Sequence, residues 1–453
     1  MDKRHLLIVI LAAGKGTRMK SALPKVMHMV GGRTLLSHVM ATARRAGASK
    51  LAVVVGPDMP QVRTEALAAV PGAEVYEQTL QRGTADAVLA ARPALQDFSG
   101  DVLVLFGDTP FIAVDTLLAM RAKLSAGADV VVLGFHAADA TGYGRLVLDG
   151  SGALVAIREH NDATHAELAI AFCNAGVMGF RSERLLAILD RIGTVNAKGE
   201  YYLTDAVQIA RGDGLATAAI AAEEHEVFGI NSRVQLAEAE TTFQKRARIR
   251  AMDGGATLIA PDTVFFSHDT VIGTDVLIEP HVFFGPGVVI GDEAQIKAYS
   301  HLEQARVGRG ARVGPFARLR PGADLGADVH IGNFVEVKNV TMEAGAKANH
   351  LAYLGDGHVG AGANIGAGTI FCNYDGFNKH RTQIGAAAFI GSNSSLVAPV
   401  KIGDGAYIGS GSVITRDVAP GALALERSKQ EVREGWAAKF RATMAKRKPP
   451  RVP

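Results

Sequence analysis

The sequence feature that most limits the possible folds is a bulky apolar residue at every sixth position between Ile272 and Ile414. Three runs carry this repeat, which are Ile272, Ile278, Phe284, Ile290, Ile296 and Leu302; Val307, Val313, Leu319, Leu325, Ile331 and Val337; and Ile384, Ile390, Leu396, Ile402, Ile408 and Ile414. Val359, Ile365 and Phe371 also follow the six-residue period, which makes 21 hexads. A period of six fits neither the 3.6-residue turn of an α-helix nor a hairpin meander, whereas it fits short strands joined by tight turns. Three such hexads make one triangular turn, so the repeat predicts a solenoid of about seven turns with a stacked apolar interior.

Before the solenoid, apolar strand-like segments alternate with helical ones. The expected strands are Leu7–Leu11, Leu51–Val55, Val102–Phe106 and Val130–Leu133, and the expected helices are Leu35–Ala46, Gln61–Ala69 and Thr84–Ala91. This alternation predicts an open α/β domain with a parallel sheet, in which ligands bind beyond the carboxyl ends of the strands. We therefore expect an α/β domain over residues 1–229, a helical linker over 230–252, and the solenoid with a C-terminal helix and tail over 253–453.

A glycine-rich string follows the first expected strand. It reads LAAGKGTRM over residues 11–19, and Pro24 and Lys25 come shortly afterwards. Small residues let backbone N–H groups approach phosphate oxygens, and Arg18 and Lys25 add positive charge that suits a departing pyrophosphate. The complete string resembles the signature of sugar-1-phosphate nucleotidyltransferases, whose α/β domain is Rossmann-like.

An aspartate at the end of another expected strand is a candidate metal ligand. Asp108 follows Phe106-Gly107, where a carboxylate is well placed to hold Mg²⁺ against a triphosphate. The resemblance implies that Asp108 and Asn231 bind this metal ion. It also implies nucleotide and sugar contacts at Leu11, Ala12, Ala13, Gly14, Lys25, Gln78, Gly83, Thr84, Gly144, Glu159, Asn174 and Asn231. Within this set, Gln78, Gly83 and Thr84 match the segment that reads uracil, and the segment Glu200–Asp205 matches a further family segment near the sugar.

Two departures from the family pattern leave the nucleotide and sugar selectivity open. Ala85 and Asp86 follow the Gly-Thr pair, where relatives often have Gly-His. Phe106 stands where a tyrosine is common, so a hydroxyl is lost.

The hexad register fails or takes insertions between Val337 and Ile384, and polar residues gather there. The step from Phe371 to Ile384 is seven residues longer than a hexad, so we expect a loop to leave the coil near Asp375-Gly376. His350 is suited to deprotonate an amine, and Arg320 and Lys338 are suited to hold a sugar phosphate. Asparagine and backbone N–H groups can stabilise the oxyanion of an acyl transfer. This interruption therefore predicts a second active site.

The whole chain, from about residue 6 to residue 436, resembles the bacterial bifunctional N-acetylglucosamine-1-phosphate uridyltransferase/glucosamine-1-phosphate acetyltransferase family. The resemblance implies a left-handed parallel β-helix, a homotrimer packed through it, and UTP and acetyl-CoA as co-substrates. It makes His350 the general base. It places glucosamine-1-phosphate at Arg320, Lys338, Tyr353 and Asn364, and acetyl-CoA at Ala367, Asn373, Tyr374, Ser392, Ser410 and Arg427. The implied product is UDP-N-acetylglucosamine, a cell-envelope precursor.

Charge and cysteine content limit the possible partners and the cellular compartment. A net charge of +3 over 453 residues is too small to indicate a nucleic-acid partner. With only Cys173 and Cys372 there is no disulfide framework, which favours a reducing compartment. No stretch approaches the ~20 apolar residues of a membrane span. We expect a cytoplasmic protein whose basic end, from Lys446 to Arg451, is a solvated tail.

Two other functions fit parts of the pattern. One is a single-function nucleotidyltransferase, such as an ADP-glucose pyrophosphorylase, with a structural or regulatory β-helix. The other is a non-catalytic subunit of the same layout. The cluster of His350, Tyr353 and Asn373 disfavours the first, and the intact set of Arg18, Lys25 and Asp108 disfavours the second.

Overall fold

The computed structural model describes residues 4–447, which form two compact units divided between Arg246 and Ala247. The first unit holds a nine-stranded sheet with the order β11-β7-β10-β6-β1-β4-β5, and with β8 and β9 at its side. The strands are β1 (His5–Ala12), β4 (Lys50–Val55), β5 (Glu74–Glu77), β6 (Gly100–Phe106), β7 (Val130–His136), β8 (Arg145–Leu148), β9 (Leu154–Arg158), β10 (Phe172–Arg181) and β11 (Thr217–Ala222). The four predicted strands lie within β1, β4, β6 and β7.

The sheet is mixed rather than wholly parallel. β1 pairs in parallel with β4 and β6, and β11 pairs in parallel with β7. β10 runs antiparallel to both β6 and β7. The chain reaches β10 from the antiparallel β8–β9 pair and not through a long crossover helix, so it enters the sheet in the opposite direction. The prediction of a parallel sheet therefore holds for the part that carries the glycine-rich string.

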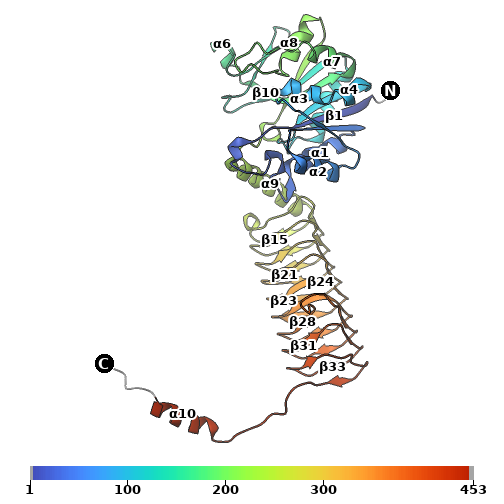
Figure 1. The fold of residues 1–453 in the computed structure, drawn as a ribbon, viewed down its shortest axis with the longest axis vertical. Coiled ribbons are helices and arrows are strands. Elements are labelled where there is room, and N and C mark those ends of the chain that lie inside the picture. Colours follow the sequence, from blue (N-terminus) through green and yellow to red (C-terminus); the bar gives the residue numbers. More distant parts are fainter. Residues whose placement is uncertain (1–3, 448–453) are drawn as a thin grey trace, which may run out of the picture. The chain divides into compact units, whose positions relative to one another are not determined.

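Helices cover both faces of this sheet (Figure 1). One face packs against α1 (Leu35–Arg45), α2 (Pro60–Ala69) and α5 (Val114–Ser125). The other packs against α3 (Thr84–Ala90), α4 (Arg92–Gln96), α7 (Ser182–Leu189) and α8 (Asp205–Gly212). Side chains of β1 alternate between the two cores, with Ile8 in one and Val9 in the other, and both are fully buried. β1 and β6 are parallel, so the loops after Ala12 and Phe106 leave the sheet at the same edge.

The second unit is a stack of short parallel strands (Figure 1). Leu277–Ile278 (β14) pairs with Gln295–Ile296 (β17), so the partners lie three hexads apart in sequence. β17 in turn pairs with Arg312–Val313 (β20), where Ile296 faces Val313 one residue earlier than the period requires. The stack thus absorbs the predicted slip of one residue. Among the predicted repeat residues, those from Ile278 onward are at most 5% exposed, whereas Ile272, in the first coils of the stack, is partly exposed.

The repeat continues through much of the stretch where the sequence suggested an interruption. β24 (Glu336–Met342) pairs with β26 (Tyr353–Val359), and β25 (Lys347–His350) pairs with β27 (Asn364–Ile365). Met342, Ala348 and Leu354 are fully buried and occupy the interior positions. Two further slips of one residue, after Val337 and after Leu354, together with the small Ala348, hide the period in the sequence. The interpretation of a broken register is therefore wrong for residues 338–371, although Val359, Ile365 and Phe371 are buried as the six-residue period predicted.

A loop does leave the coil after residue 372. β27 pairs with Phe389–Ile390 (β30), and Ile365 faces Ile390. One turn of three hexads spans 18 residues, but Ile365 and Ile390 are 25 residues apart. The seven additional residues confirm the predicted insertion. Within it, Asp375 Oδ1 accepts hydrogen bonds from the backbone N–H groups of Phe377 at 2.8 Å and Asn378 at 2.7 Å. The turn at Asp375-Gly376 is therefore built as the sequence suggested.

Two further helices complete the described chain. α9 (Arg233–Asp253) contains the division between the two units, and α10 is Trp436–Arg447. The last residues of the predicted basic tail, from 448 onward, lie outside the described residues. Over residues 4–447, no helix is long and apolar enough to span a bilayer.

Candidate active sites

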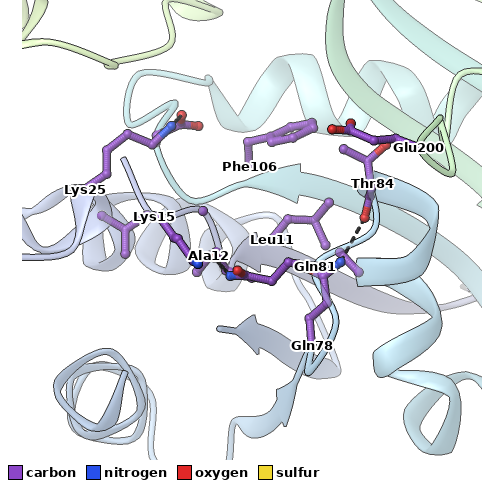
Figure 2. Close-up of a pocket in the computed structure, with 15 residues that line it drawn as sticks. Leu11, Ala12, Lys15, Lys25, Gln78, Gln81, Thr84, Phe106 and Glu200 are labelled. Carbon is purple, nitrogen blue, oxygen red and sulfur yellow. Dashed lines mark hydrogen bonds and ion pairs between the residues drawn. The ribbon is translucent and has the colours of Figure 1, made fainter. Parts of the chain in front are cut away.

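The glycine-rich string forms one wall of a pocket of about 330 Å³ at the carboxyl edge of the sheet (Figure 2). The pocket is lined by Leu11, Ala12, Ala13, Gly14, Lys15, Lys25, Val26, Gln78, Gln81, Gly83, Thr84, Ala87, Phe106, Asp108 and Glu200. Gly16 has a left-handed backbone with φ of 62°, and an added Cβ would lie 2.6 Å from the Cβ of Lys25. Glycine at this position therefore lets the string fold against the segment that carries Lys25.

Lys25, Asp108 and Asn231 meet at the edge of this pocket. The Lys25 ammonium forms an ion pair with Asp108 and donates to Asn231 Oδ1 at 2.9 Å. One carboxylate and one amide oxygen therefore converge on a single cation, and these are the ligand types that Mg²⁺ takes together with substrate phosphates. The donor atoms of the predicted pair, Asp108 and Asn231, are therefore of the type that suits Mg²⁺. Among the described residues there is no cluster of three His, Cys, Asp or Glu side chains that could hold a metal ion, so substrate oxygens and water would have to complete the coordination.

A second hollow of about 440 Å³ contains the predicted sugar-binding residues. It is lined by Arg18, Phe106, Asp108, Thr109, Thr141, Gly142, Tyr143, Gly144, Glu159, Asn174, Ala175, Gly176, Val227, Gly229, Asn231 and Gln235. Phe106 and Asp108 line both hollows, so the two cavities meet at the end of β6. Burial raises the pKa of Glu159, and Thr204 Oγ1 donates to its carboxylate at 3.2 Å.

The predicted uracil-reading residues lie at the far side of the first pocket from Lys25 (Figure 2). Gly83 has φ of 132°, and an added Cβ would lie 2.5 Å from the carbonyl oxygen of Tyr201. Thr84 Oγ1 accepts a hydrogen bond from the backbone N–H of Leu203 at 2.9 Å. The segment Glu200–Asp205 is thereby held against the start of α3, and Glu200 lines the pocket.

Lys15 and Gln81 also line the pocket, although neither was predicted as a site residue. Gln81 Nε2 donates to the carbonyl oxygen of Ala13 at 2.5 Å, which ties the uracil side of the pocket to the glycine-rich string. Gln81 has a left-handed backbone with φ of 46°. Lys15 stands between Gly14 and Gly16 of the string, and this position could have indicated that Lys15 lines the pocket.

In the solenoid, a buried carboxylate joins several predicted residues. Asp356 Oδ2 lies 3.5 Å from the Lys338 ammonium and accepts from Asn373 Nδ2 at 2.5 Å, while Asp356 Oδ1 accepts from Asn339 Nδ2 at 2.7 Å. Burial alone would raise the pKa of Asp356, but these two amide donors and Lys338 lower it overall. Asp356 was not predicted, although it carries the only carboxylate in the conspicuous NHLAYLGD segment.

Tyr353 and Asn373 meet above Gly355. A Cβ on Gly355 would lie 2.5 Å from Tyr353 Oη and 2.8 Å from Asn373 Nδ2. Tyr374 is exposed and donates to the carbonyl oxygen of Gly376 at 2.6 Å, so its hydroxyl is engaged within the insertion loop. The structure therefore brings Tyr353 and Asn373 together but holds the Tyr374 hydroxyl in its own loop.

Three basic residues converge beside this cluster. Arg320 donates to Glu336 Oε1 at 2.8 Å. Lys379 lies against Lys338, and contact with the Lys338 ammonium lowers the pKa of Lys379, with Arg320 contributing further. Lys379 was missed because it lies in the insertion, outside the repeat. Two adjacent ammonium groups near a guanidinium form a setting for a phosphate group.

His350 ends β25, and its ring orientation is set by a neighbour in the preceding coil. Asn333 Oδ1 lies 2.6 Å from His350 Nδ1, and the backbones of the two residues pair in the ladder. An amide oxygen only accepts, so Nδ1 carries the hydrogen and Nε2 presents its lone pair. His350 is exposed, so this nitrogen is accessible. The arrangement supplies a base in the tautomer that can take a proton.

Three of the predicted acetyl-CoA residues, Ala367, Ser392 and Ser410, lie in one column with His350, whereas Asn373 and Tyr374 lie outside it. The ladder aligns Ala348 with Ile365, Ile365 with Ile390, and Ile390 with Ile408. The residues two positions further on are His350, Ala367, Ser392 and Ser410, which therefore occupy the same corner of four successive coils. Arg427 extends this column, because its guanidinium donates to the Ser410 carbonyl oxygen at 2.9 Å. Asn364 starts β27, on the same coil as Ala367.

Comparisons with known proteins find matches for both units of the chain. Residues 8–170 match the MobA-like NTP transferase domain, and residues 381–416 match the bacterial transferase hexapeptide family of six repeats. The chain is 61% identical over 448 residues to bifunctional protein GlmU of Azorhizobium caulinodans, covering 99% of this chain and 100% of the relative. It is also 61% identical over 448 residues to that of Xanthobacter autotrophicus, with the same coverage.

The chain belongs to the GlmU family. The bifunctional transferase family and the fold class predicted from the sequence are thereby confirmed, since the relatives match both units, and the parallel stack is consistent with a left-handed β-helix. Bifunctional protein GlmU of a Bradyrhizobium species is 57% identical over 441 residues, covering 97% of this chain and 98% of the relative.

A solved structure is a more distant match. The crystal structure of 4-diphosphocytidyl-2C-methyl-D-erythritolsynthase from Anaerococcus prevotii has a TM-score of 0.40 and 17% identity, covering 54% of this chain and 100% of that one. This likeness is too distant to indicate a function.

Proposed function

We propose that the chain makes UDP-N-acetylglucosamine in two steps, one in each unit. The solenoid transfers an acetyl group from acetyl-CoA to glucosamine-1-phosphate. The α/β unit then joins the resulting sugar phosphate to UTP and releases pyrophosphate. Membership of a bifunctional family over the full length supports both halves. The observation that carries the proposal is that each unit assembles its own set of reactive side chains.

Acetyl transfer begins with removal of a proton from the amine of glucosamine-1-phosphate. His350 Nε2 accepts this proton, because Asn333 holds Nδ1 in its protonated form. The amine nitrogen attacks the thioester carbonyl carbon, and the carbon–sulfur bond breaks. As the amide forms, the nitrogen gives up a second proton, and the sulfur takes up a proton and leaves as the CoA thiol. Lys338, Lys379 and Arg320 are the cations available for the sugar phosphate.

The column of Ala367, Ser392 and Ser410 gives acetyl-CoA a place to lie along the coils. It starts at His350 and ends at Arg427, whose guanidinium suits the phosphate groups of CoA. A purely structural β-helix would have no need of a titratable residue at the start of such a column. This alignment favours the bifunctional enzyme over a single-function nucleotidyltransferase.

Uridylyl transfer uses the two hollows that meet at Phe106 and Asp108. UTP fits the pocket between the glycine-rich string and Gln78, and the sugar phosphate fits beside Glu159 and Asn174. The phosphate oxygen of the sugar attacks the α-phosphorus, and the bond to the β-phosphate breaks. Arg18 and Lys25 balance the charge of the leaving pyrophosphate. Asp108 and Asn231 would hold Mg²⁺, which would add positive charge near the triphosphate.

A paired assay on the purified chain tests this proposal. With glucosamine-1-phosphate and acetyl-CoA, free thiol should appear. With N-acetylglucosamine-1-phosphate, UTP and Mg²⁺, pyrophosphate should appear. Thiol without pyrophosphate, or pyrophosphate without thiol, would contradict the bifunctional assignment.

We also propose that the chain forms a homotrimer through the β-helix. A ladder of stacked aromatic rings runs along one corner of the coils, with ring centroids 4.8 to 5.2 Å apart, and consists of His281, Tyr299, Phe316 and Phe334. Tyr299, Phe316 and Phe334 are 45–55% exposed. Asn333 pairs with His350, so Phe334 faces Leu351 in the following coil, and Leu351 is also exposed. Leu351 follows His350 in the sequence, so this exposed corner extends to His350. A second copy packed on these rings would lie beside the acetyl-transfer residues.

Light scattering tests the trimer. The solution mass should be three times the 47.5 kDa of the chain. A monomer or dimer mass at micromolar concentration would contradict this assembly.

A further inference from the structure

The side-chain amide of Gln78 is held in one orientation by two acceptors. Gln78 is 5% exposed and lines the nucleotide pocket. Its Nε2 donates to the carbonyl oxygen of Gly83 at 2.9 Å and to Asp86 Oδ2 at 2.9 Å. A carbonyl oxygen and a carboxylate oxygen can only accept from an amide. Turning the amide over would place its oxygen against both acceptors, so Nε2 stays where it is.

Asp86 is itself held firmly. Its Oδ1 accepts from the Arg82 guanidinium at 2.9 and 3.3 Å, and its Oδ2 accepts from the Arg82 backbone N–H at 3.2 Å. The Arg82 guanidinium lies over the Tyr201 ring, 5.1 Å from its centroid. Burial by itself would raise the pKa of Asp86, but the bonds from Gln78 and Arg82 lower it overall. The carboxylate is therefore ionised at neutral pH and acts only as an acceptor.

The orientation of Gln78 decides which nucleobase edge it can meet. Both hydrogens of Nε2 are used inside the protein, so Oε1 is the atom left to bond a ligand, and it only accepts. Uracil presents an N3–H donor on its pairing edge, whereas cytosine presents an unprotonated N3 acceptor at the same place. An accepting Oε1 attracts the first and repels the second.

We propose that Asp86 is a positioning residue that sets the preference for UTP over CTP by fixing the Gln78 amide. The inference rests on the proposed uridylyl transfer and deepens it. Ala85 and Asp86 are the departure from the family pattern that left the nucleotide selectivity open.

A simpler role for Asp86 does not account for all its contacts. Asp86 lies in the first turn of α3, where a carboxylate stabilises the helix N-terminus and accepts a nearby backbone N–H. That role explains the bond from the Arg82 backbone. Capping of the helix does not explain why Asp86 Oδ2 also accepts from Nε2 of Gln78, which lines the pocket.

Nucleotide competition tests the proposal on the full-length chain. The kcat/KM for pyrophosphate release is measured with UTP and with CTP for the wild type, Asp86→Asn, Gln78→Ala and the double variant. The asparagine amide cannot accept from both Gln78 and Arg82, so Gln78 keeps only the Gly83 carbonyl as a fixed acceptor and its orientation is held less tightly. The UTP/CTP ratio of Asp86→Asn should fall about tenfold, the discrimination expected of one well-placed hydrogen bond. The double variant should match Gln78→Ala, because Asp86 acts through Gln78.

Controls separate selectivity from folding and from the proposed function itself. Asp115→Asn removes an exposed carboxylate from the first turn of α5 and should keep the wild-type ratio. If Asp86→Asn does not fold, Arg82→Gln decides, because it frees the carboxylate at a half-exposed position and should lower the ratio about threefold. An unchanged ratio in a folded Asp86→Asn or Arg82→Gln overturns the proposal, as does a further fall in the double variant. A wild type without UTP turnover would instead refute uridylyl transfer.

Discussion

Replacing His350 with alanine should lower acetyl transfer at least about a hundredfold and leave pyrophosphate release from UTP unchanged. His350 Nε2 is the base that the Asn333 contact leaves free at the start of the Ala367–Ser410 column. Without it, the protonated amine has no acceptor close to the thioester, and an ammonium group is not a nucleophile. The measurement is the rate of free thiol formation beside the rate of pyrophosphate formation in one preparation.

Two further variants sharpen this experiment. His358→Ala removes another solenoid histidine, which pairs with Glu343, and should leave both rates near wild type. Asn333→Ala should lower the thiol rate about tenfold, since it removes one hydrogen bond that orients the ring. A folded His350→Ala protein that loses both activities together would contradict the assignment of separate sites. A folded His350→Ala protein that keeps its thiol rate would contradict the role of His350 as the base.

Replacing Asp108 with asparagine should produce the opposite pattern. Pyrophosphate release should fall about a thousandfold, because metal charge on the triphosphate is worth several kcal/mol and about 1.4 kcal/mol corresponds to tenfold in rate. Acetyl transfer should be unchanged. Asp108 and Asn231 together contact the Lys25 ammonium, and Asp108 supplies the carboxylate of this pair. Asparagine has nearly the same shape as aspartate but carries no charge. The measurement is the pyrophosphate rate over a range of Mg²⁺ concentrations.

Asp115→Asn is the matched control, since it removes an exposed carboxylate from α5 in the same unit. An Asp108→Asn protein with near-normal rates and normal Mg²⁺ dependence would show that the metal binds elsewhere. The two variants also test each other. A mixture of His350→Ala and Asp108→Asn should convert glucosamine-1-phosphate to the nucleotide sugar, because each protein performs the step that the other lacks.

The predictions from sequence were most accurate where one residue type had to repeat or where a motif was contiguous. The hexads from Ile278 to Val337 became the buried interior of the stack. The glycine-rich string became a wall of a pocket because its glycines leave room for the backbone, as at Gly16. Both results follow from short-range sterics, which a linear pattern records directly.

The prediction of an interrupted repeat was wrong for residues 338–371, for an identifiable reason. A slip of one residue moved the interior positions to Met342, Ala348 and Leu354, and alanine does not stand out as a bulky apolar residue. Lys379 and Gln81 were missed because nothing in their local sequence marks them. Asp356 stands in a conspicuous segment, but its sequence does not show that its carboxylate meets Lys338, Asn339 and Asn373. Their importance comes from neighbours that lie far away along the chain or in the next coil.

By itself, the sequence determined the two-part layout, the hexad solenoid and the residue types of both sites. Periodicity and contiguous motifs are properties of the chain, so they can be read without coordinates. Only the tertiary structure decided which groups act together. It aligned His350 with Ala367, Ser392 and Ser410, set Asn333 against the His350 ring, and set Asp86 against Gln78. Register and hydrogen-bond geometry belong to the packed chain, because a slip of one residue between coils would bring different side chains together.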